Sequence, residues 1–414
     1  MTQSRATQSQ TNNSGLLRIC CAVCFFCFFG AYMRIPVFPL FAASLGADAV
    51  QVGLLNALFL LMAGLLCVPA GIFSDRVGRR IPILAGILIL GCSSLLMYVS
   101  SGISQLVVIC ALAGIGTAVF APPLMSYVAD ITPPARLGSA FGWYTTCLYG
   151  GMTVGPAIGG VLGRTMGFRP VFLLAGVLVL ALFPAVYFFM RPPPVGSDRV
   201  GRPQVTLSFV ITTLRNRRLA VCLGTMLGSC IGYGMFITYM PLYARTLGLD
   251  SAQIGLVFAA QALANALSRL PFGRLGDRLG DRSMLVVLGL SGFSLSLLLL
   301  GSAGSLGMLL CGAVLFGIAL GVAFTALVAL TAEAAPRELR GLALGFYNSC
   351  LYLGMMLSSA GMGFLIRLQG YAAAFYLCAA ISMLVALLFY VWYRRPASED
   401  PLSAERSAEC SAES

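Results

Sequence analysis

The sequence predicts an all-α membrane protein with twelve transmembrane helices in two pseudo-symmetric six-helix bundles. Three observations support this class: an apolar composition, twelve apolar runs of span length and an internal repeat. Of the 414 residues, 59% are hydrophobic and 10% are charged, and the mean hydropathy is +0.91. A water-soluble chain of this composition would lack the polar residues needed to cover its surface.

Apolar runs of about twenty residues, the length that a helix needs to cross the hydrocarbon core, alternate with short polar loops. Each run ends where charged residues, Gly or Pro gather again. The twelve predicted helices begin near Leu17, Val50, Ile81, Gln105, Leu137, Arg169, Leu219, Ala252, Ser283, Leu306, Gly341 and Tyr371.

All 26 basic residues are arginines, and their distribution predicts the orientation in the membrane. Twenty fall in loops on the side shared by both termini, and four fall on the other side. The positive-inside rule therefore predicts a cytoplasmic membrane protein with both termini in the cytoplasm. The net charge of +12 follows from this topology, so we expect the lipid bilayer, and no nucleic acid, as a partner. The two remaining arginines, Arg34 and Arg269, lie within predicted spans.

An internal repeat divides the chain into two halves. "PLFAASLGADAVQVGL" from Pro39 matches "PLYARTLGLDSAQIGL" from Pro241, and "FGWYTTCLYGGM" from Phe141 matches "LGFYNSCLYLGM" from Leu344. We therefore expect six-helix bundles over 16–190 and 219–393, joined by a cytoplasmic linker over 191–218 that is rich in Pro and Arg. Parallel halves of this kind are typical of transporters that rock about a central site. The polar leader, 1–15, and tail, 394–414, are predicted to be disordered and cytoplasmic.

A short glycine- and arginine-rich loop follows the second predicted helix and recurs after the eighth. The first copy comprises Gly71, Asp75, Arg76, Gly78, Arg79 and Arg80, and the second comprises Gly273, Asp277, Arg278, Gly280 and Arg282. This loop resembles the signature loop of the major facilitator superfamily, and the resemblance covers nearly the whole chain. It implies the fold of that superfamily and an alternating-access mechanism.

The same loops predict a cytoplasmic gate. Beside the eleven loop residues, we assign Asp130, Arg269 and Glu333 to this gate, because their charges lie at or near the same end of the helices. The alternative is that the basic residues only anchor the topology. Asp281 stands where a basic residue is expected in the second copy, which predicts weaker contacts there.

The fifth predicted helix carries "GGMTVGPAIGGVLG". A ridge of small residues lets helices approach closely, and a proline loosens the helix beside it. Gly151, Gly155, Gly159 and Gly163 recur every four residues and form this ridge; the motif itself is assigned to Gly151, Gly155, Pro156, Gly159 and Gly160. It is similar to the antiporter motif of drug-exporting members of the superfamily. Close helix packing without antiport is the alternative.

Proton coupling has weak support in the sequence. Exporters of this type carry an Arg and a Gln in helix four, where this chain has Cys110 and Ala113. Asp48 and Asp250 fit capping boxes, with Gln three residues later, better than they fit coupling carboxylates. No carboxylate or His lies in the middle of a span. Protons therefore remain a candidate coupling ion only through helix-end acids or the substrate itself.

Arg34 presents the sharpest question, since an arginine in a span faces a bundle interior, a cavity or a partner. In one interpretation it faces the central cavity and binds an anionic group of the substrate; in the other it snorkels or bonds carbonyls freed by Pro36 and Pro39. The remaining cavity candidates are polar or aromatic residues in spans: Tyr32, Asn56, Tyr127, Tyr149, Tyr233, Tyr239, Gln261, Asn265, Tyr347, Asn348 and Tyr352. Tyr149 and Tyr352 are repeat equivalents.

Together these features predict a secondary active transporter, an exporter of small amphipathic drugs or metabolites. The alternatives are an organic-anion exchanger or facilitator that uses Arg34 and, more distantly, a membrane sensor that transports nothing. We expect no enzyme, no cofactor and no metal site, because nucleotide loops, metal-ligand spacings and nucleophile–base sets are missing from the sequence. A monomer with a small-molecule substrate is expected.

Overall fold

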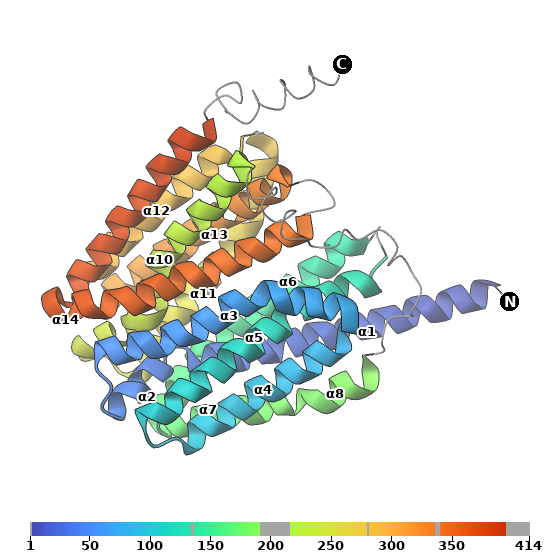
Figure 1. Cartoon of the computed structure of the whole chain (residues 1–414), viewed down its shortest axis with the longest axis horizontal. Coiled ribbons are helices and arrows are strands. Elements are labelled where there is room, and N and C mark those ends of the chain that lie inside the picture. Colours follow the sequence, from blue (N-terminus) through green and yellow to red (C-terminus); the bar gives the residue numbers. More distant parts are fainter. Residues whose placement is uncertain (1, 134–135, 191–215, 280, 336–339, 395–414) are drawn as a thin grey trace, which may run out of the picture.

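The structure is a computed structural model that describes residues 2–133, 136–190, 216–279, 281–335 and 340–394. Within these ranges the chain is helical, with loops of a few residues (Figure 1). Helices satisfy their own backbone hydrogen bonds, which is why they can cross a bilayer.

The first half begins with a span that is broken by prolines. Its helices are α1 (Thr2–Arg34), α2 (Phe38–Ser44), α3 (Ala49–Val77), α4 (Arg80–Val99), α5 (Ile103–Ile131), α6 (Leu137–Thr165), α7 (Phe168–Leu180) and α8 (Leu182–Phe189). The second half comprises α10 (Arg217–Thr246), α11 (Ser251–Leu279), α12 (Ser283–Gly301), α13 (Leu306–Ala334) and α14 (Arg340–Arg394).

These helices make the twelve spans that the sequence predicts. The first span is α1 with α2, the sixth is α7 with α8, and α14 contains the last two, separated by a non-helical Gly370 with φ 84°. By length and hydropathy alone, nine segments of the described chain qualify as membrane spans, and α6 and α11 are not among them. Both carry many small or polar residues, and they pack against each other between the halves.

Two boundaries differ from the predictions. Residues 2–14 belong to α1, in place of the expected disordered leader; the polar stretch contains no Pro, and no Gly before Gly15, that would end the helix. The helix α10 begins at Arg217, inside the expected linker, and the rest of that linker up to residue 215 lies outside the described residues, as does the tail from residue 395.

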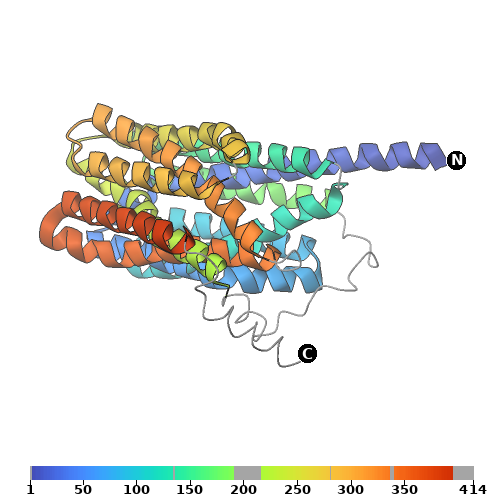
Figure 2. The ribbon, with the colours of Figure 1, turned by 90° about the horizontal axis from the view of Figure 1, so that it is seen from above.

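Two groups of helices are visible, one coloured blue to green and the other yellow to red (Figure 1). Within the first group α1 packs on α6 and α3 on α5; within the second α10 packs on α14 and α11 on α13. The groups meet along α3 with α14 and along α6 with α11, and the helices of both run in roughly one direction when seen from above (Figure 2).

The repeat extends to the backbone. Gly167 and Gly370 are equivalent in the repeat, and both adopt positive φ, at 86° and 84°. Only glycine adopts this conformation without a steric penalty, so the same turn closes the fifth-to-sixth and eleventh-to-twelfth connections. The Asp48 capping box is also present, and Asp250 exchanges the same two hydrogen bonds with Gln253. Both cap predictions are confirmed.

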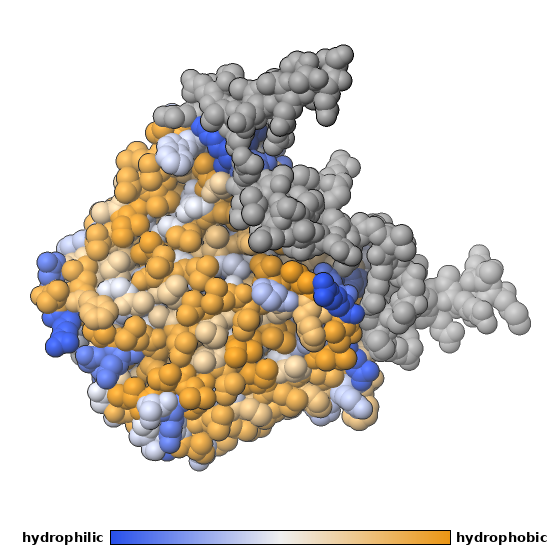
Figure 3. Space-filling model, in the orientation of Figure 1, coloured by the Kyte–Doolittle hydropathy of each residue, from blue (hydrophilic) through white to orange (hydrophobic). Residues whose placement is uncertain are grey.

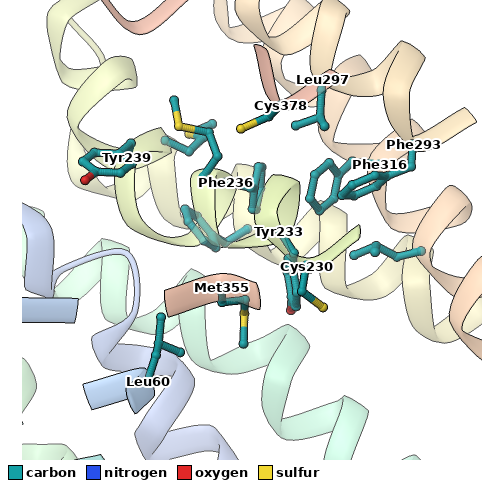
Figure 4. Packing of buried hydrophobic residues seen from close by; sticks show 14 of the residues in the cluster. Leu60, Cys230, Tyr233, Phe236, Tyr239, Phe293, Leu297, Phe316, Met355 and Cys378 are labelled. Atoms are coloured by element: carbon teal, nitrogen blue, oxygen red, sulfur yellow. The ribbon is translucent and has the colours of Figure 1, made fainter. Parts of the chain in front are cut away.

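Aromatic packing holds the second half together. Phe236 on α10 stacks on Phe316 of α13 with ring centroids 4.6 Å apart, and Phe293 of α12 lies 4.7 Å from Phe316 (Figure 4). All three side chains are fully buried. Tyr233, one turn from Phe236, lies on the side of this cluster that faces Met355 (Figure 4). The cluster therefore packs α10, α12 and α13 together.

The outside of the described helices is largely apolar. The space-filling view shows a broad hydrophobic face with hydrophilic residues near its margins (Figure 3). Large exposed apolar side chains include Leu88, Phe364, Leu368 and Leu384. In water such a surface would be unstable, whereas in a bilayer it contacts lipid, so the chain is an integral membrane protein.

Candidate functional site

Five tyrosines gather between the two halves at the middle of the spans. We call them the tyrosine cluster: Tyr32, Tyr149, Tyr233, Tyr347 and Tyr352. Tyr32 on α1 lies near Tyr149 on α6, Tyr233 on α10 and Tyr352 on α14. The Tyr347 hydroxyl donates to the Phe324 carbonyl of α13 at 3.4 Å. Each was predicted as a cavity candidate, and the structure brings all five together.

Arg269 lies at this cluster. Its guanidinium carbon is 4.6 Å from the centre of the Tyr149 ring, in a cation–π contact that joins α11 to α6. Its Nε donates to Asn265 Oδ1 at 2.8 Å, and it also interacts electrostatically with Tyr233 and Tyr347. In the sequence Arg269 lies near the inner-end charges of the predicted gate. Helix α11 carries its side chain back toward the middle of the spans, where it meets Tyr149.

The side chain of Arg34, the last residue of α1, has no hydrogen-bond partner in the described part of the chain. Its Nε and Nη1 atoms are buried and unpaired, and the titratable side chain with which it interacts is Cys110 on α5. The predicted alternative of bonds to freed carbonyls is therefore not realised. An unpaired guanidinium within a membrane span is costly, and a buried polar group without a partner calls for a ligand, water or ion.

The charge balance of this region is positive. Every Asp and Glu in the described residues lies at or near a helix end: Asp48, Asp75, Asp130, Asp250, Asp277, Asp281 and Glu333. No ion pair within 4.0 Å joins Arg34 or Arg269 to any of them. Arg269 and the five phenols of the tyrosine cluster therefore lie together without an ion-paired carboxylate, while Arg34 lies beside Cys110 of α5.

Two predicted cavity residues instead join the halves. The Asn56 side-chain amide, on α3, donates to Thr238 Oγ1 at 2.6 Å and to Ser359 Oγ at 3.2 Å. The Tyr239 hydroxyl donates to the Ser359 carbonyl at 2.6 Å, and the side chain is fully buried. A Cβ added to Gly53 would overlap that hydroxyl. Tyr239 thus packs at the contact between α3 and α14 and does not face a cavity.

The remaining candidates separate by helix face. Tyr127 is only 1% exposed and packs in the core of the first half with Cys24, Leu124 and Tyr144, which corrects its assignment to the cavity. Gln261 is buried on α11, near α13. Asn348 is exposed and donates to the Leu344 carbonyl of its own helix at 3.0 Å.

At one end of the bundle the two halves are closely packed. We call this the outer end; it is the end opposite the signature loops. A Cβ added to Gly160 on α6 would overlap the Ser251 carbonyl oxygen and lie 2.9 Å from Gly255 Cα on α11. At the equivalent position of the second half, a Cβ added to Gly363 would lie 2.9 Å from Val50 Cα on α3. The predicted glycine ridge therefore serves cross-half packing here.

The rest of that ridge contacts α1. A Cβ at Gly151 would lie 2.6 Å from the Phe25 carbonyl oxygen, and one at Gly155 would lie 2.7 Å from that of Phe29. Gly159 packs in the same way against Met33. Pro156 presents its carbonyl to Gly255. The ridge thus holds α6 between its own half and the other half.

The opposite end, which carries the signature loops, is called the inner end. Arg79 pairs with Asp75, with Asp130 at 3.1 Å and with Ser74 at 3.2 Å. Both ion pairs lie within the first half. Toward this end, a Cβ added to Gly71 on α3, or to Gly138 or Gly142 on α6, would meet no atom within 4 Å.

In the second copy Arg282 pairs with Asp277 and Glu333. Its repeat equivalent is Arg80, which instead lies over the Tyr187 ring at 4.9 Å. Asp281, which replaces the expected base, accepts hydrogen bonds from the backbone and hydroxyl of Ser283. The Arg282 side chain is 26% exposed against 9% for Arg79, and each makes two ion pairs. Arg76 and Arg278 take no part in these ion pairs. A Cβ added to Gly273 would lie 3.6 Å from Thr325, and Gly280 lies outside the described residues.

Comparison with known proteins places the chain in a family. The model of the Major Facilitator Superfamily matches residues 20–251 and 222–411. An uncharacterized MFS-type transporter of Methanocaldococcus jannaschii is 24% identical over 364 residues, which cover 87% of this chain and 93% of the relative. The multidrug resistance protein MdtG of Proteus mirabilis is 27% identical over 391 residues, which cover 90% and 94%.

Solved structures have the same fold. A bacterial homolog of the human lysosomal transporter Spinster, in an inward-facing and occupied conformation, superposes with a TM-score of 0.74 at 18% identity, over 92% of this chain and 97% of that one. The same homolog in an inward-facing and unoccupied conformation gives a TM-score of 0.71 over 93% and 99%. The chain is a transporter that belongs to the Major Facilitator Superfamily.

Proposed function

We propose that this transporter exports small amphipathic compounds across the cytoplasmic membrane, as a monomer with both termini in the cytoplasm. The bundles 16–190 and 219–393 would rock against each other and expose the tyrosine cluster to one side at a time. The similarity to MdtG, whose name refers to multidrug resistance, supports this proposal. So does the combination of apolar, aromatic and hydrogen-bonding groups at the cluster, which suits amphipathic solutes.

One observation carries the mechanism. The halves are packed backbone to backbone at the outer end, at Gly160 and Gly363. Nearer the inner end α14 meets α3 through side chains, as at Gly345 and Val68, and a Cβ added to Gly71, Gly138 or Gly142 would meet no atom within 4 Å. Such a difference between the two ends is what alternating access requires of one conformation. We assign this conformation to the inward-facing state.

The coupling ion is a separate part of the proposal. Because the described acids lie at helix ends, proton antiport would have to use the helix-end acids, among them Asp250 at the outer end, or the substrate itself. Flux measurements at fixed membrane potential, with and without a pH gradient, separate proton coupling from uniport.

The test of the transport proposal is flux in proteoliposomes that contain the purified full chain. Fluorescent amphipathic dyes of positive, zero and negative charge are loaded inside, and their release is compared with that from protein-free liposomes. We expect saturable release of at least one dye. If no dye leaves faster than from empty liposomes, under any imposed gradient, the sensor interpretation replaces transport.

The unpaired Arg34 guanidinium favours a second candidate, an organic-anion exchanger or facilitator. Ligand-induced thermal stabilisation of the full chain tests it, since a ligand that binds the native state raises its stability. If anions stabilise the wild type and that shift vanishes in a folded Arg34→Gln variant, Arg34 is a substrate ligand. If the variant retains the shift, Arg34 is structural and the exporter stands as the first candidate.

A further inference from the structure

We infer that the substrate site is centred on Arg269 and takes amphipathic organic anions, in which a carboxylate or sulfonate sits on a flat apolar body. This inference rests on the proposed transport function and names the substrate class of its site. It depends on Arg269 and Tyr149, whereas the second candidate function above depends on Arg34.

The contacts of Arg269 leave its anion-binding edge free. Tyr149 covers one face of the guanidinium at 4.6 Å, and Asn265 accepts from Nε at 2.8 Å. A guanidinium has five N–H donors, so the four on Nη1 and Nη2 remain available, and two of them, one from each nitrogen, point in parallel along the edge opposite Nε. That edge is the one that binds a carboxylate through two parallel hydrogen bonds.

Neighbouring side chains hold this edge in place. Asn265 is 5% exposed and one helical turn before Arg269 on α11, so the hydrogen bond to Nε fixes the rotamer along the helix. The Tyr149 ring comes from the other half of the molecule. A stacked, hydrogen-bonded guanidinium loses less side-chain entropy when it binds an anion, because little freedom remains to be lost.

The surroundings select charge. No carboxylate forms an ion pair with Arg269 in the described residues. In a region of low dielectric constant an uncompensated cation repels cationic solutes and attracts anions. A lipophilic cation would therefore bind poorly at the tyrosine cluster.

The surroundings also select shape. Tyr32 on α1, Tyr233 on α10 and Tyr352 on α14 lie near one another. Aromatic rings that line a site favour flat apolar groups, and phenol hydroxyls add hydrogen bonds at their edges. A ligand with an aromatic body and one anionic group would match both the rings and Arg269.

The test compares three probes of one shape in the purified full chain: 2-naphthoate, uncharged 2-naphthamide and cationic 2-naphthylmethylammonium. Affinities are measured by calorimetry in detergent for wild type and Arg269→Gln. We expect the wild type to prefer the carboxylate, and Arg269→Gln to bind naphthoate about tenfold to hundredfold more weakly, the range of a charge-assisted hydrogen bond. Naphthamide should change little.

The matched control is Arg274→Gln, on the same helix and exposed toward the inner end, which should retain the charge preference. If Arg269→Gln does not fold, Arg269→Lys and Tyr149→Leu are tested in its place. Lys keeps the positive charge but lacks the two parallel N–H donors, and Leu removes the aromatic ring that contacts the guanidinium. Both should weaken naphthoate more than naphthamide. Equal affinities for the three probes in the wild type, or an unchanged preference in Arg269→Gln, would overturn the inference.

Dye flux in the same preparations separates this inference from the transport proposal. Flux of neutral or cationic dyes without preference for naphthoate overturns the substrate class and leaves transport standing. Charge-selective binding of naphthoate without flux of any dye supports the site and overturns the transport proposal.

Discussion

The guanidinium of Arg164 on α6 lies 3.1 Å from the carboxylate of Asp250, which caps the start of α11. This ion pair joins the two halves at the outer end. The repeat equivalents are Arg367 and Asp48, both in the described part of the chain, and no ion pair within 4.0 Å joins them. The repeat therefore supplies two equivalent cross-half pairs, of which this conformation makes one.

The first prediction concerns this pair. Asp250→Asn should weaken outer closure, because Asn keeps the helix cap but loses the charge. The Arg164 and Asp250 side chains are 62% and 31% exposed, so the pair is worth about 0.2–1 kcal/mol, and the ratio of closed to open outer ends should fall by up to about fivefold. Hydrogen–deuterium exchange at the outer ends of α6 and α11 measures this. Asp48→Asn is the matched control. Equal deuterium uptake in both variants would show that the Arg164–Asp250 pair does not hold the outer end closed.

The second prediction concerns the contact of Gly160 on α6 with α11 at the same outer end. Gly160→Ala should prevent close approach of α6 and α11, since the added methyl overlaps backbone atoms of α11. We expect a loss of about 1–3 kcal/mol in stability, seen as a lower Tm, together with slower dye flux. Gly142→Ala, on the same helix, meets no atom within 4 Å and should leave Tm unchanged or raised. Similar behaviour of the two variants would show that closure does not depend on this contact.

Much of the fold could be predicted from the sequence. Span length and the caps depend on residues close together in the chain, and the repeat is visible as matching segments of the two halves. Span number and the hydrogen bonds at Asp48 and Asp250 follow from such local patterns. The direction of a side chain does not. Tyr127 and Tyr149 are both tyrosines in spans, yet packing between α5 and its neighbours buries the first, while the second lies under Arg269.

Arg269 illustrates the same limit. Its position in the sequence, two residues before Pro271 and near the signature loop, indicated an inner-end role. Its long side chain reaches a ring from another helix, and that contact depends on how α6 and α11 pack. Likewise, the arginine that makes the ion pairs is Arg79 in the first copy and Arg282 in the second. These two positions differ by one residue in the repeat, and an alignment of the two halves does not reveal this shift.

The third prediction compares the two signature loops. Arg79→Gln should destabilise the protein by about 1–3 kcal/mol, because the side chain is buried and its loss removes the charged contacts that Arg79 makes with Asp75 and Asp130. Arg282→Gln should cost less, about 0–1 kcal/mol, because that guanidinium and its two acids are more exposed. Tm in detergent measures both. The exposed Arg76→Gln should have the smallest effect; a larger loss for Arg282→Gln than for Arg79→Gln would refute this order.

The fourth prediction tests the polar contact that joins α3 to the second half. The Asn56 amide donates to hydroxyls of Thr238 and Ser359, which are 2.7 Å from each other. Because these groups share hydrogen bonds, Asn56→Ala and Ser359→Ala should not add: their coupling should be about 0.5–1 kcal/mol, typical of hydrogen bonds between membrane helices. A double-mutant cycle read by thermal unfolding measures it.

The control for that cycle pairs Asn56→Ala with Ser294→Ala. The Ser294 hydroxyl donates to the Ala379 carbonyl at 2.7 Å, entirely within the second half, so these two substitutions should add. If the Asn56 and Ser359 variants also add, the hydrogen bonds contribute nothing to the association of the halves. In that case outer closure depends on the glycine contacts and the Arg164–Asp250 pair, and Gly160→Ala should then have the larger effect on flux. Coupling confined to the Ser359 pair would instead place Asn56 among the residues that hold the outer end closed.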